Sequence, residues 1–467
     1  MTAQAWRLSA AGLGAAYASG KTDPASVLAA LDERIGKLNP RLNAIIARDP
    51  GAAAAAREST ARLRERKPRG PLEGIPFTVK DSILAAGMPC TWGSRLMRGY
   101  VPADDELPVA RLRAAGAIVV GKTNVPEFTL EGYTSNPVFG TTRNPWNPGL
   151  TPGGSSGGAV AAVAAGLGPF AICTDGGGSI RRPACHAGVV GFKPSIGRVA
   201  RGPSLPQILL DFEVIGPVAR TVADAELAFR AIAGPDVRDR RSLYRGDDRH
   251  AGQPLRLLYV PRFGDAPVDP QVLASTNAAA RALAALGIDV SEGELPFDVS
   301  PLAEFWPILG QVGVAHVLAR HPGSDHLVGE RMRAMAQEGR KIAAERYLAG
   351  IEAVEAFRRR VTDCYEAYDL IMTPSAAALP WPADQPYPEI IDGRSVGPRG
   401  HAVYTGWVNA CGHPAIALPG NPSPDGMPTG FQLVARFGAD EQLFAIAAQY
   451  ERVHPWASRW PALALEA

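Results

Sequence analysis

Short apolar segments that alternate with helical segments constrain the fold of this chain most strongly. Ile75–Val79, Ala117–Val120 and Ala171–Thr174 are apolar along most of their length and show no regular alternation with polar residues. Such segments are typical of strands in a sheet that is covered on both faces. A helical pattern over 109–115 ends at Gly116, directly before the second of these strands. The chain is therefore predicted to be an α/β protein.

The alternation of predicted helices and short apolar strands continues along the chain, without an internal repeat or a linker between dissimilar halves. Helices are expected over most of the first 65 residues, where Asp23-Pro24 is a helix-start signal, and later at 221–235, 270–287, 326–360 and 440–450. Further strands are expected at 255–260, 288–290 and 369–374, with a closing hairpin of 415–418 and 429–434. One large domain is therefore predicted.

Within that domain we expect three stretches. Residues 1–70 would form a helical segment packed on the core, and 71–220 the core with the catalytic residues. Residues 221–467 would complete the same domain, with 235–330 as an inserted or variable layer.

The charge balance excludes several classes of partner. The chain carries 48 basic and 46 acidic residues, a net charge of +2. Such a balance predicts no strong attraction to nucleic acid or to an anionic membrane. No stretch approaches 18 apolar residues without glycine or charge, and the N-terminus lacks the pattern of a signal peptide. We therefore expect no membrane partner.

The cysteines point to a reducing compartment. There are five, an odd number, and they are widely spaced without a Cys-x-x-Cys pair. Neither a disulfide framework nor a zinc site follows from that spacing. The prediction is a cytoplasmic protein, a monomer or homodimer, that needs no metal and no organic cofactor.

Two glycine-crowded turns carry the candidate chemistry. Gly153–Gly158 holds Ser155, and Thr174–Arg181 holds Ser179. An apolar helix that leads away from the first turn and a strand that returns to the second could bring the two turns together. The run Gly176–Gly178 before Ser179 offers successive N–H groups that could hold an oxyanion, although such a run also suits phosphate binding or a tight loop.

A serine nucleophile needs a base, and the sequence offers two kinds. None of the eight histidines lies in a recognisable triad setting, and His186 also fits a plain buried turn. Lys80 directly follows an apolar strand, so its amine could enter the interior. Lowering a lysine pKa from about 10.4 to near neutrality takes about 4 kcal/mol of differential environment, which burial can supply. Taken alone, Lys80 could equally be a surface lysine at a strand end.

Taken together, these motifs resemble the amidase signature family. Gly74–Asp81 is similar to the lysine strand of that family, and Pro152–Gly158 to its first serine turn. Thr174–Pro183 is similar to its nucleophile turn, and the resemblance covers roughly residues 5–455. Cys173 and Ser195 depart from the usual glycine and threonine, at positions that are not expected to touch the reacting groups.

The resemblance implies one domain with a central twisted mixed β-sheet covered by helices on both faces. It implies acyl transfer with Ser179 as the nucleophile and Lys80 as the terminal base. Ser155, whose preceding peptide bond is cis in the family, would relay the proton between them. The backbone of Ser179 would join the oxyanion donors, which are Gly176, Gly177 and Gly178.

Other residues are expected to support the site or shape the substrate pocket. The supporting residues are Ser156, Asp175 and Arg181. The predicted pocket residues are Tyr133, Arg182 and Trp381. Arg182 could bind a substrate carboxylate or simply lie on the surface. The proline- and aromatic-rich loop 376–398 indicates an apolar or aromatic substrate.

The predicted activity is hydrolysis of a small-molecule amide, with carbamates and esters as further substrates of the same carbonyl geometry. A first alternative is the glutamine-hydrolysing component of a tRNA-dependent amidotransferase, which releases ammonia from glutamine together with partner subunits. A second is a Gly-x-Ser-x-Gly esterase, since Gly153–Gly157 fits that motif. The preceding 147–152 cannot be the central strand which that motif needs. A third alternative is an inactive scaffold. It predicts that a serine or the lysine is missing, but Lys80, Ser155 and Ser179 are all present.

Overall fold

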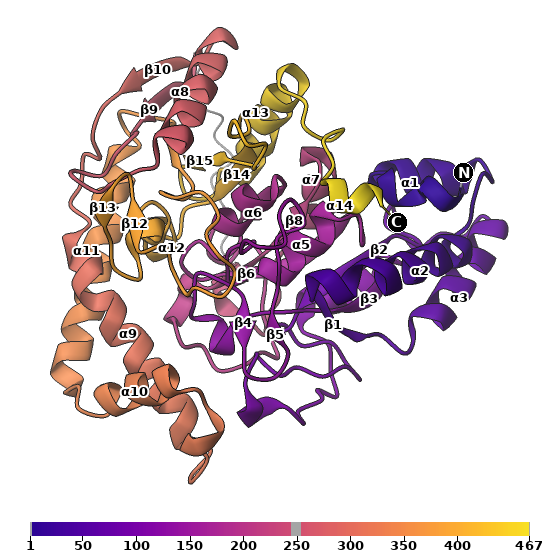
Figure 1. Ribbon diagram of the computed structural model, residues 1–467, viewed down its shortest axis with the longest axis horizontal. Helices are drawn as coiled ribbons and strands as arrows, with labels where there is room; N and C mark the ends of the chain where they lie inside the picture. The colour runs from indigo at the N-terminus through magenta and orange to yellow at the C-terminus, as the bar shows by residue number, and fades with distance from the viewer. Residues whose placement is uncertain (1, 244–253, 467) are drawn as a thin grey trace.

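An eleven-stranded sheet runs through the whole protein (Figure 1). The structure, a computed structural model, describes residues 2–243 and 254–466. In spatial order the strands are β1 (Ile45–Arg48), β3 (Ile118–Thr123), β2 (Pro76–Lys80), β6 (Phe170–Asp175), β8 (Val214–Ala219), β7 (Val190–Lys193), β14 (Ala415–Pro419), β15 (Gly430–Ala435), β11 (Leu370–Pro374), β9 (Arg256–Tyr259) and β10 (Asp289–Glu292). Two small hairpins, β4–β5 (Ser135–Asn136, Gly140–Thr141) and β12–β13 (Ile390–Ile391, Arg394–Ser395), lie outside it.

The sheet is mixed. β2 is parallel to both β3 and β6, and β9 is parallel to both β10 and β11. The strands between these two groups pair antiparallel, and β1 closes one edge antiparallel to β3. The predicted closing hairpin is confirmed, with Ala415 opposite Val434 in β14 and β15. β2, which ends at Lys80, and β6, which leads to the turn of Ser179, therefore lie side by side in the parallel part.

Helices cover both faces of the sheet, as the sequence predicts. They are α1 (Ala10–Ala18), α2 (Pro24–Leu42), α3 (Ala52–Arg64), α4 (Leu107–Ala114), α5 (Gly157–Ala164), α6 (Arg181–Ala187), α7 (Val222–Ile232), α8 (Pro270–Ala285), α9 (Ser300–Ala319), α10 (Glu330–Gly339), α11 (Ala344–Cys364), α12 (Gly406–Cys411), α13 (Asp440–Val453) and α14 (Ala462–Leu465). Short 3₁₀ helices are η1 (Thr2–Arg7), η2 (Arg95–Met97), η3 (Glu127–Thr129), η4 (Leu210–Phe212), η5 (Arg240–Leu243), η6 (Asp325–Leu327) and η7 (Gly400–Ala402).

Side chains of one strand enter two different apolar layers. Phe170 and Ile172 of β6 pack in the cluster that includes α4, α7, α8 and α13. Ala171 and Cys173 of the same strand pack in the cluster that includes α5 and α6. Successive side chains of a strand point to opposite faces, so an apolar strand without alternation is what two covered faces require.

The start of α2 shows how local sequence fixes an element. The side chain of Asp23 caps the helix by accepting a hydrogen bond of 2.9 Å from the N–H of Ser26. Pro24 occupies the first turn, where a missing N–H costs nothing. The helix ends at Leu42, and the next residue, Asn43, has a left-handed φ of 50°. The predicted helix start is therefore confirmed.

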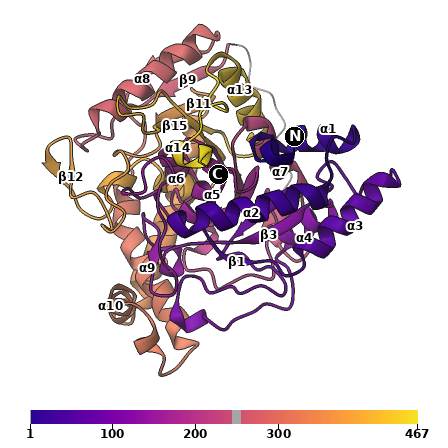
Figure 2. The same ribbon diagram turned by 45° about the vertical axis from the view of Figure 1, so that its right-hand side comes forward.

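The ends of the chain lie near each other in both views, with the α9–α10 pair on the far side of the molecule (Figures 1 and 2). The guanidinium of Arg34 in α2 donates to the carbonyl of Ala464 in α14 at 2.6 Å. The rings of Trp6 and Trp460 meet edge to face, with centroids 4.6 Å apart. These contacts hold the N-terminal helices to the last turn of the chain.

Glycine and proline account for the strands that the sequence did not reveal. β8 contains Gly216-Pro217, which resembles a turn, and β7 contains Gly191. A Cβ at Gly216 would lie 2.0 Å from the carbonyl oxygen of Phe192, so close strand contact requires glycine there. Pro217 pairs with Ile172 although it cannot donate a hydrogen bond to the sheet.

The helical region predicted over 326–360 is not one helix. It contains η6, α10 and most of α11, with a break between Gly339 and Ala344. α9 was not predicted, because Pro307, Gly310 and Gly313 interrupt its pattern. α9 packs against both α10 and α11.

The first 65 residues, predicted to be helical, also contribute β1 to the sheet. At four residues, β1 is too short for its pattern to be told from a helical one. Within 235–330, β9 and β10 belong to the main sheet as well. The subdivision of the domain at residues 70 and 220 stays a prediction.

Among the described residues, one helix is long and apolar enough to cross a membrane by length and composition alone, namely α9. Half of its apolar stretch is buried against the rest of the protein. Leu309 and Val314 of this helix are fully buried in two different apolar clusters. Its apolar composition is thus accounted for by packing inside the fold.

Phe192 lies where the sheet meets α7 and α13, and its removal should cost stability. Its ring centroid is 4.9 Å from that of Phe229 and 4.3 Å from that of Phe444. Phe192→Ala should lower the free energy of unfolding by about 3–5 kcal/mol, because a buried ring leaves a cavity. Urea denaturation followed by circular dichroism measures the loss. Val453→Ala, at a half-exposed position of α13, is the control and should stay within about 0.5 kcal/mol. Equal midpoints for the two variants would contradict this packing.

Candidate active site

Lys80 ends β2 with its amine enclosed in the protein. The residue is fully buried. Nζ donates to the hydroxyl of Ser155 at 2.8 Å, and to the carbonyl and hydroxyl oxygens of Thr174, each at 2.9 Å. Burial lowers the pKa of Lys80 to about 8. An amine with this pKa is partly neutral near pH 7 and can accept a proton.

Ser155 comes from the first glycine turn, directly before α5. The Gly154–Ser155 peptide bond is cis, as the family resemblance implies. The turn packs tightly, since a Cβ at Gly154 would lie 2.5 Å from the carbonyl oxygen of Tyr133. Ser155 is almost fully buried, and its hydroxyl faces the amine of Lys80.

Ser179 comes from the second glycine turn, between β6 and α6. The N–H of Ser156 donates to the carbonyl oxygen of Ser179 at 3.2 Å, which joins the two turns through their backbones. The Ser179 side chain reaches a cavity, whereas Lys80 and Ser155 lie behind it in the interior. The structure therefore brings together the three residues on which the predicted chemistry depends.

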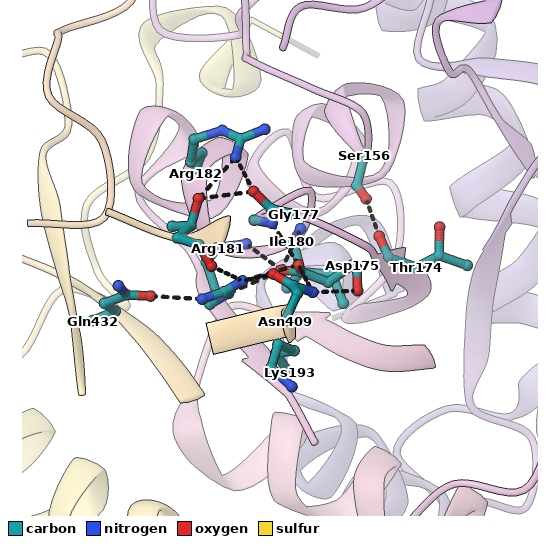
Figure 3. Close-up of polar contacts among 12 residues, drawn as sticks. Ser156, Thr174, Asp175, Gly177, Ile180, Arg181, Arg182, Lys193, Asn409 and Gln432 are labelled. Atoms are coloured by element: carbon teal, nitrogen blue, oxygen red, sulfur yellow. Dashed lines mark hydrogen bonds and ion pairs between the residues drawn. The ribbon is translucent and has the colours of Figure 1, made fainter. Parts of the chain in front are cut away.

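An ion pair between Asp175 and Arg181 braces the turn that carries Ser179 (Figure 3). Arg181 contacts the carboxylate through Nε and Nη2, each at 3.0 Å, and both side chains are fully buried. Asn409 adds a hydrogen bond of 2.9 Å to the same carboxylate. Burial alone would raise the pKa of Asp175, but the Arg181 charge and these hydrogen bonds hold that pKa well below its usual range.

The carboxylate of Asp175 also occupies two backbone donors of the turn. It accepts from the N–H of Gly178 at 2.6 Å and from the N–H of Ile180 at 3.0 Å. Gly178 was predicted to be an oxyanion donor, and the structure differs there because this N–H already has its acceptor. In the part of the chain that the structure describes, the N–H groups of Gly176, Gly177 and Ser179 donate to no acceptor. Those three amides are the donors that remain.

Gly178 is needed for its shape. Its φ of 107° is one that L residues rarely adopt, and a Cβ there would lie 2.1 Å from Oγ1 of Thr405. Thr405 in turn donates to the carbonyl oxygen of Gly177 at 2.8 Å. The sequence pattern did not mark Thr405, because it comes from the distant segment before α12.

Ser156 and His186 are both buried near the two turns. The hydroxyl of Ser156 donates to the carbonyl of Thr174 at 3.4 Å (Figure 3). His186 is buried, and its Nε2 lies 3.1 Å from the carbonyl oxygen of Ala378. Burial lowers the pKa of His186 to about 4, so its ring is neutral. His186 therefore fits the buried-turn interpretation that the sequence left open.

The cavity at Ser179 measures about 80 Å³. Its lining residues come from six segments of the chain and are Thr129, Leu130, Glu131, Gly132, Gly177, Ser179, Arg182, Leu209, Trp306, Arg331, Pro398, Arg399, His401 and Ala402. Of the three predicted pocket residues, Arg182 is in the lining. Trp381 lies behind the lining, its ring 4.8 Å from that of His401, and Tyr133 follows the lining residue Gly132. The sequence did not mark Trp306, Arg399 or His401, because they converge only in the folded chain.

In residues 2–243 and 254–466, no group of three or more His, Cys, Asp or Glu side chains is placed to hold a metal ion. The turn that carries Ser179 lies beside that of Ser155, whose hydroxyl contacts Lys80, and it presents backbone amides. Such a set can transfer protons and stabilise an oxyanion.

Comparisons with known proteins agree with this geometry. The family model described as Amidase matches residues 26–444. An acylamidase from Rhodococcus erythropolis is 34% identical over 476 residues, covering 97% of each chain. The glutamyl-tRNA(Gln) amidotransferase subunit from Symbiobacterium thermophilum is 32% identical, covering 98% of this chain and 99% of its own. The solved structure of 6-aminohexanoate cyclic dimer hydrolase in complex with its substrate is 30% identical with a TM-score of 0.89, covering 98% of this chain and 99% of its own.

The brace between Asp175 and Arg181 can be tested through stability. Asp175→Asn keeps the shape of the side chain but leaves the Arg181 charge buried without a counter-ion. The free energy of unfolding should fall by about 3–5 kcal/mol, measured by urea denaturation. Glu226→Gln, which breaks an ion pair with Arg230 on the surface of α7, is the control and should barely move the midpoint. An Asp175→Asn protein as stable as the wild type would exclude the proposed brace.

Proposed function

This chain belongs to the amidase family and hydrolyses carboxylic amide C–N bonds, and on that premise we propose a role for each residue of its site. Ser179 is the nucleophile, Ser155 relays protons, and Lys80 is the base. One observation carries the proposal: the buried amine of Lys80 donates to the hydroxyl of Ser155, beside the turn that presents Ser179 to the cavity.

The reaction begins with attack of Ser179 Oγ on the amide carbonyl. Its proton passes to the Ser155 oxygen while the Ser155 proton passes to the neutral amine of Lys80. The C–N bond then breaks, and the leaving nitrogen takes a proton back along the same path. Water repeats the sequence on the acyl-enzyme, which releases the carboxylic acid and restores Ser179. Thr174 holds the amine in place for these transfers through two oxygens.

The carbonyl oxygen becomes negative when Ser179 attacks, and the backbone N–H groups of Gly176, Gly177 and Ser179 stabilise it. Their lack of other acceptors among the described residues supports this role. The loss of one such donor typically costs about 10²–10³ in rate. The ion pair of Asp175 and Arg181 holds these donors in position, since Asp175 binds the turn at Gly178 and Ile180.

We further propose that the protein acts alone on small amides, as a monomer or homodimer without nucleic acid. Small aryl or apolar groups fit the apolar lining residues Leu209 and Trp306, and carbamates and esters offer the same carbonyl. Free, buried cysteines support a cytoplasmic location. A second candidate, glutamine hydrolysis with partner subunits, is favoured by the relative from Symbiobacterium thermophilum. Hydrolysis of simple anilides by the purified chain would decide for the first.

The nucleophile can be identified by removal and by trapping. Ser179→Ala should abolish anilide hydrolysis, because the attacking oxygen is gone, and Lys80→Ala should nearly abolish it. A fluorophosphonate should label Ser179, as detected by peptide mass spectrometry. Ser9→Ala, at the cap of α1, is the control and should keep both turnover and labelling. Normal turnover by the Ser179→Ala protein, or labelling at Ser155, would refute the assignment.

The base can be identified by the pH dependence of kcat/KM. Only neutral Lys80 accepts a proton, so below its pKa of about 8 the rate should rise about tenfold per pH unit and level off above. Residual activity of Lys80→Gln should lose this inflection. Lys37→Gln, on the exposed face of α2, is the control and should keep the wild-type inflection. A profile that is flat from pH 6 to pH 9 in the wild type would rule out Lys80 as the base.

A further inference from the structure

The cavity at Ser179 is positively charged. Its described lining contains three guanidinium groups, those of Arg182, Arg331 and Arg399, and a single carboxylate, that of Glu131. Arg331 and Glu131 form an ion pair with each other at 2.6 Å. Two positive charges therefore remain beside the nucleophile without a counter-ion in the lining.

Arg182 is buried and only partly satisfied. One of its nitrogens, Nη1, contacts both the carbonyl oxygen of Gly177 and Oγ1 of Thr405 (Figure 3). Nε is buried and has no hydrogen-bond partner within residues 2–243 and 254–466. A buried charged donor without a partner is costly unless a ligand supplies an acceptor.

His401 adds a second unsatisfied group from another segment. Its side chain is 2% exposed, and neither ring nitrogen has a hydrogen-bond partner among the described residues. Packing fixes the ring, since Trp381 lies 4.8 Å away and a Cβ at Gly132 would lie 2.2 Å from Nε2. An imidazole held rigidly in the wall of a cavity, with free nitrogens, is suited to hydrogen bonding with a bound molecule.

Arg399 is an exposed cationic residue of the cavity lining. Its guanidinium lies 5.0 Å from the ring centroid of Trp306, and in the described part of the chain it forms no hydrogen bond or ion pair. A Cβ at Gly177 would lie 3.8 Å from Nη2 of Arg399 and 2.8 Å from the Trp306 ring. The charge of Arg399 is thus close to the turn that holds the oxyanion donors.

We propose that this cavity binds a carboxylate carried by the amide substrate, with Arg399, His401 and Arg182 as the residues that select it. Three groups from two distant segments offer donors to one small space, and a carboxylate has acceptors enough for several of them. The inference deepens the proposed function and rests on it, since the carboxylate would be fixed beside the bond that Ser179 attacks. The carboxylate could belong to the acyl part or to the amine part.

Two pairs of substrates test the inference. The acyl-side pair is succinic acid mono-4-nitroanilide and 4-oxopentanoic acid 4-nitroanilide, in which a methyl ketone replaces the carboxylate. The amine-side pair is 4-acetamidobenzoate and 4-acetamidoacetophenone, matched in the same way. In at least one pair the anionic member should have a kcat/KM about 10-fold to 100-fold higher, as hydrogen bonds to a charged group imply. The pair that shows the preference identifies the side. Ratios near one in both pairs would overturn the inference.

Variants assign the preference to the cavity. Arg399→Gln should reduce the anionic-to-neutral ratio about tenfold or more, Arg399→Lys should retain part of it, and His401→Phe should also reduce it. The ratio within each variant is the readout, so a general loss of turnover does not imitate the effect. Arg230→Gln on the exposed surface of α7 is the control and should keep the wild-type ratio. An Arg399→Gln ratio equal to that of the wild type would overturn the inference.

A binding measurement separates this inference from the proposed function. Benzoate should slow fluorophosphonate labelling of Ser179 at a concentration about tenfold lower than acetophenone does, and Arg399→Gln should remove the difference. Equal protection by the two compounds, with Ser179 still labelled, overturns the carboxylate site and leaves the proposed function standing. A wild-type protein whose Ser179 is not labelled, and which hydrolyses none of the four substrates, overturns both.

Discussion

The structure depends on a lysine amine that is enclosed in the protein and that, among the described residues, forms no direct ion pair with a carboxylate. Nζ of Lys80 finds only neutral oxygens, those of Ser155 and Thr174, in a site without solvent exposure. The charged form loses its hydration there, so the neutral amine is favoured relative to a lysine in water. The contacts with Ser155 and Thr174 hold the amine beside a hydroxyl, which is what a proton relay needs.

The pairing of strands in the sheet sets the distance between Lys80 and the residues it contacts. β2 and β6 are adjacent and parallel, so Lys80 at the end of one strand reaches Thr174 near the end of the other. β6 then leads straight into the turn of Ser179, and α5 starts at the turn of Ser155. Asp175 and Arg181 fix the second turn from within, because their charges neutralise each other where water is absent. The proposed catalytic groups thus lie at the ends of regular elements or in the turns next to them, whereas the cavity beside Ser179 is lined by loop residues and by side chains of α6, α9 and α10.

The sequence predicts this chemistry better than it predicts the pocket. Lys80, Ser155 and Ser179 lie in glycine-rich or strand-end motifs, where local backbone demands leave a visible pattern. The strand β8 was not predicted from the sequence, because it contains Gly216 and Pro217, which resemble a turn. The glycine is needed there because Gly216 packs closely on β7. Gly178 was predicted to be an oxyanion donor, but in the folded turn its N–H donates to the Asp175 carboxylate, which the sequence pattern could not show. His401 and Arg399 line the same cavity as Arg182 only in the folded protein, so their spacing in the sequence does not predict that they lie together.

The most direct test is the titration of the Lys80 amine in the folded protein. The chain has only seven lysines, so ¹³C,¹⁵N-lysine labelling gives few side-chain signals, and Lys80→Met identifies the one that matters. The account predicts that the Nζ signal of Lys80 titrates near pH 8, below the ordinary lysine value of about 10.4, because burial disfavours the ammonium form. An amine that stays protonated up to pH 10 in the folded enzyme would contradict it.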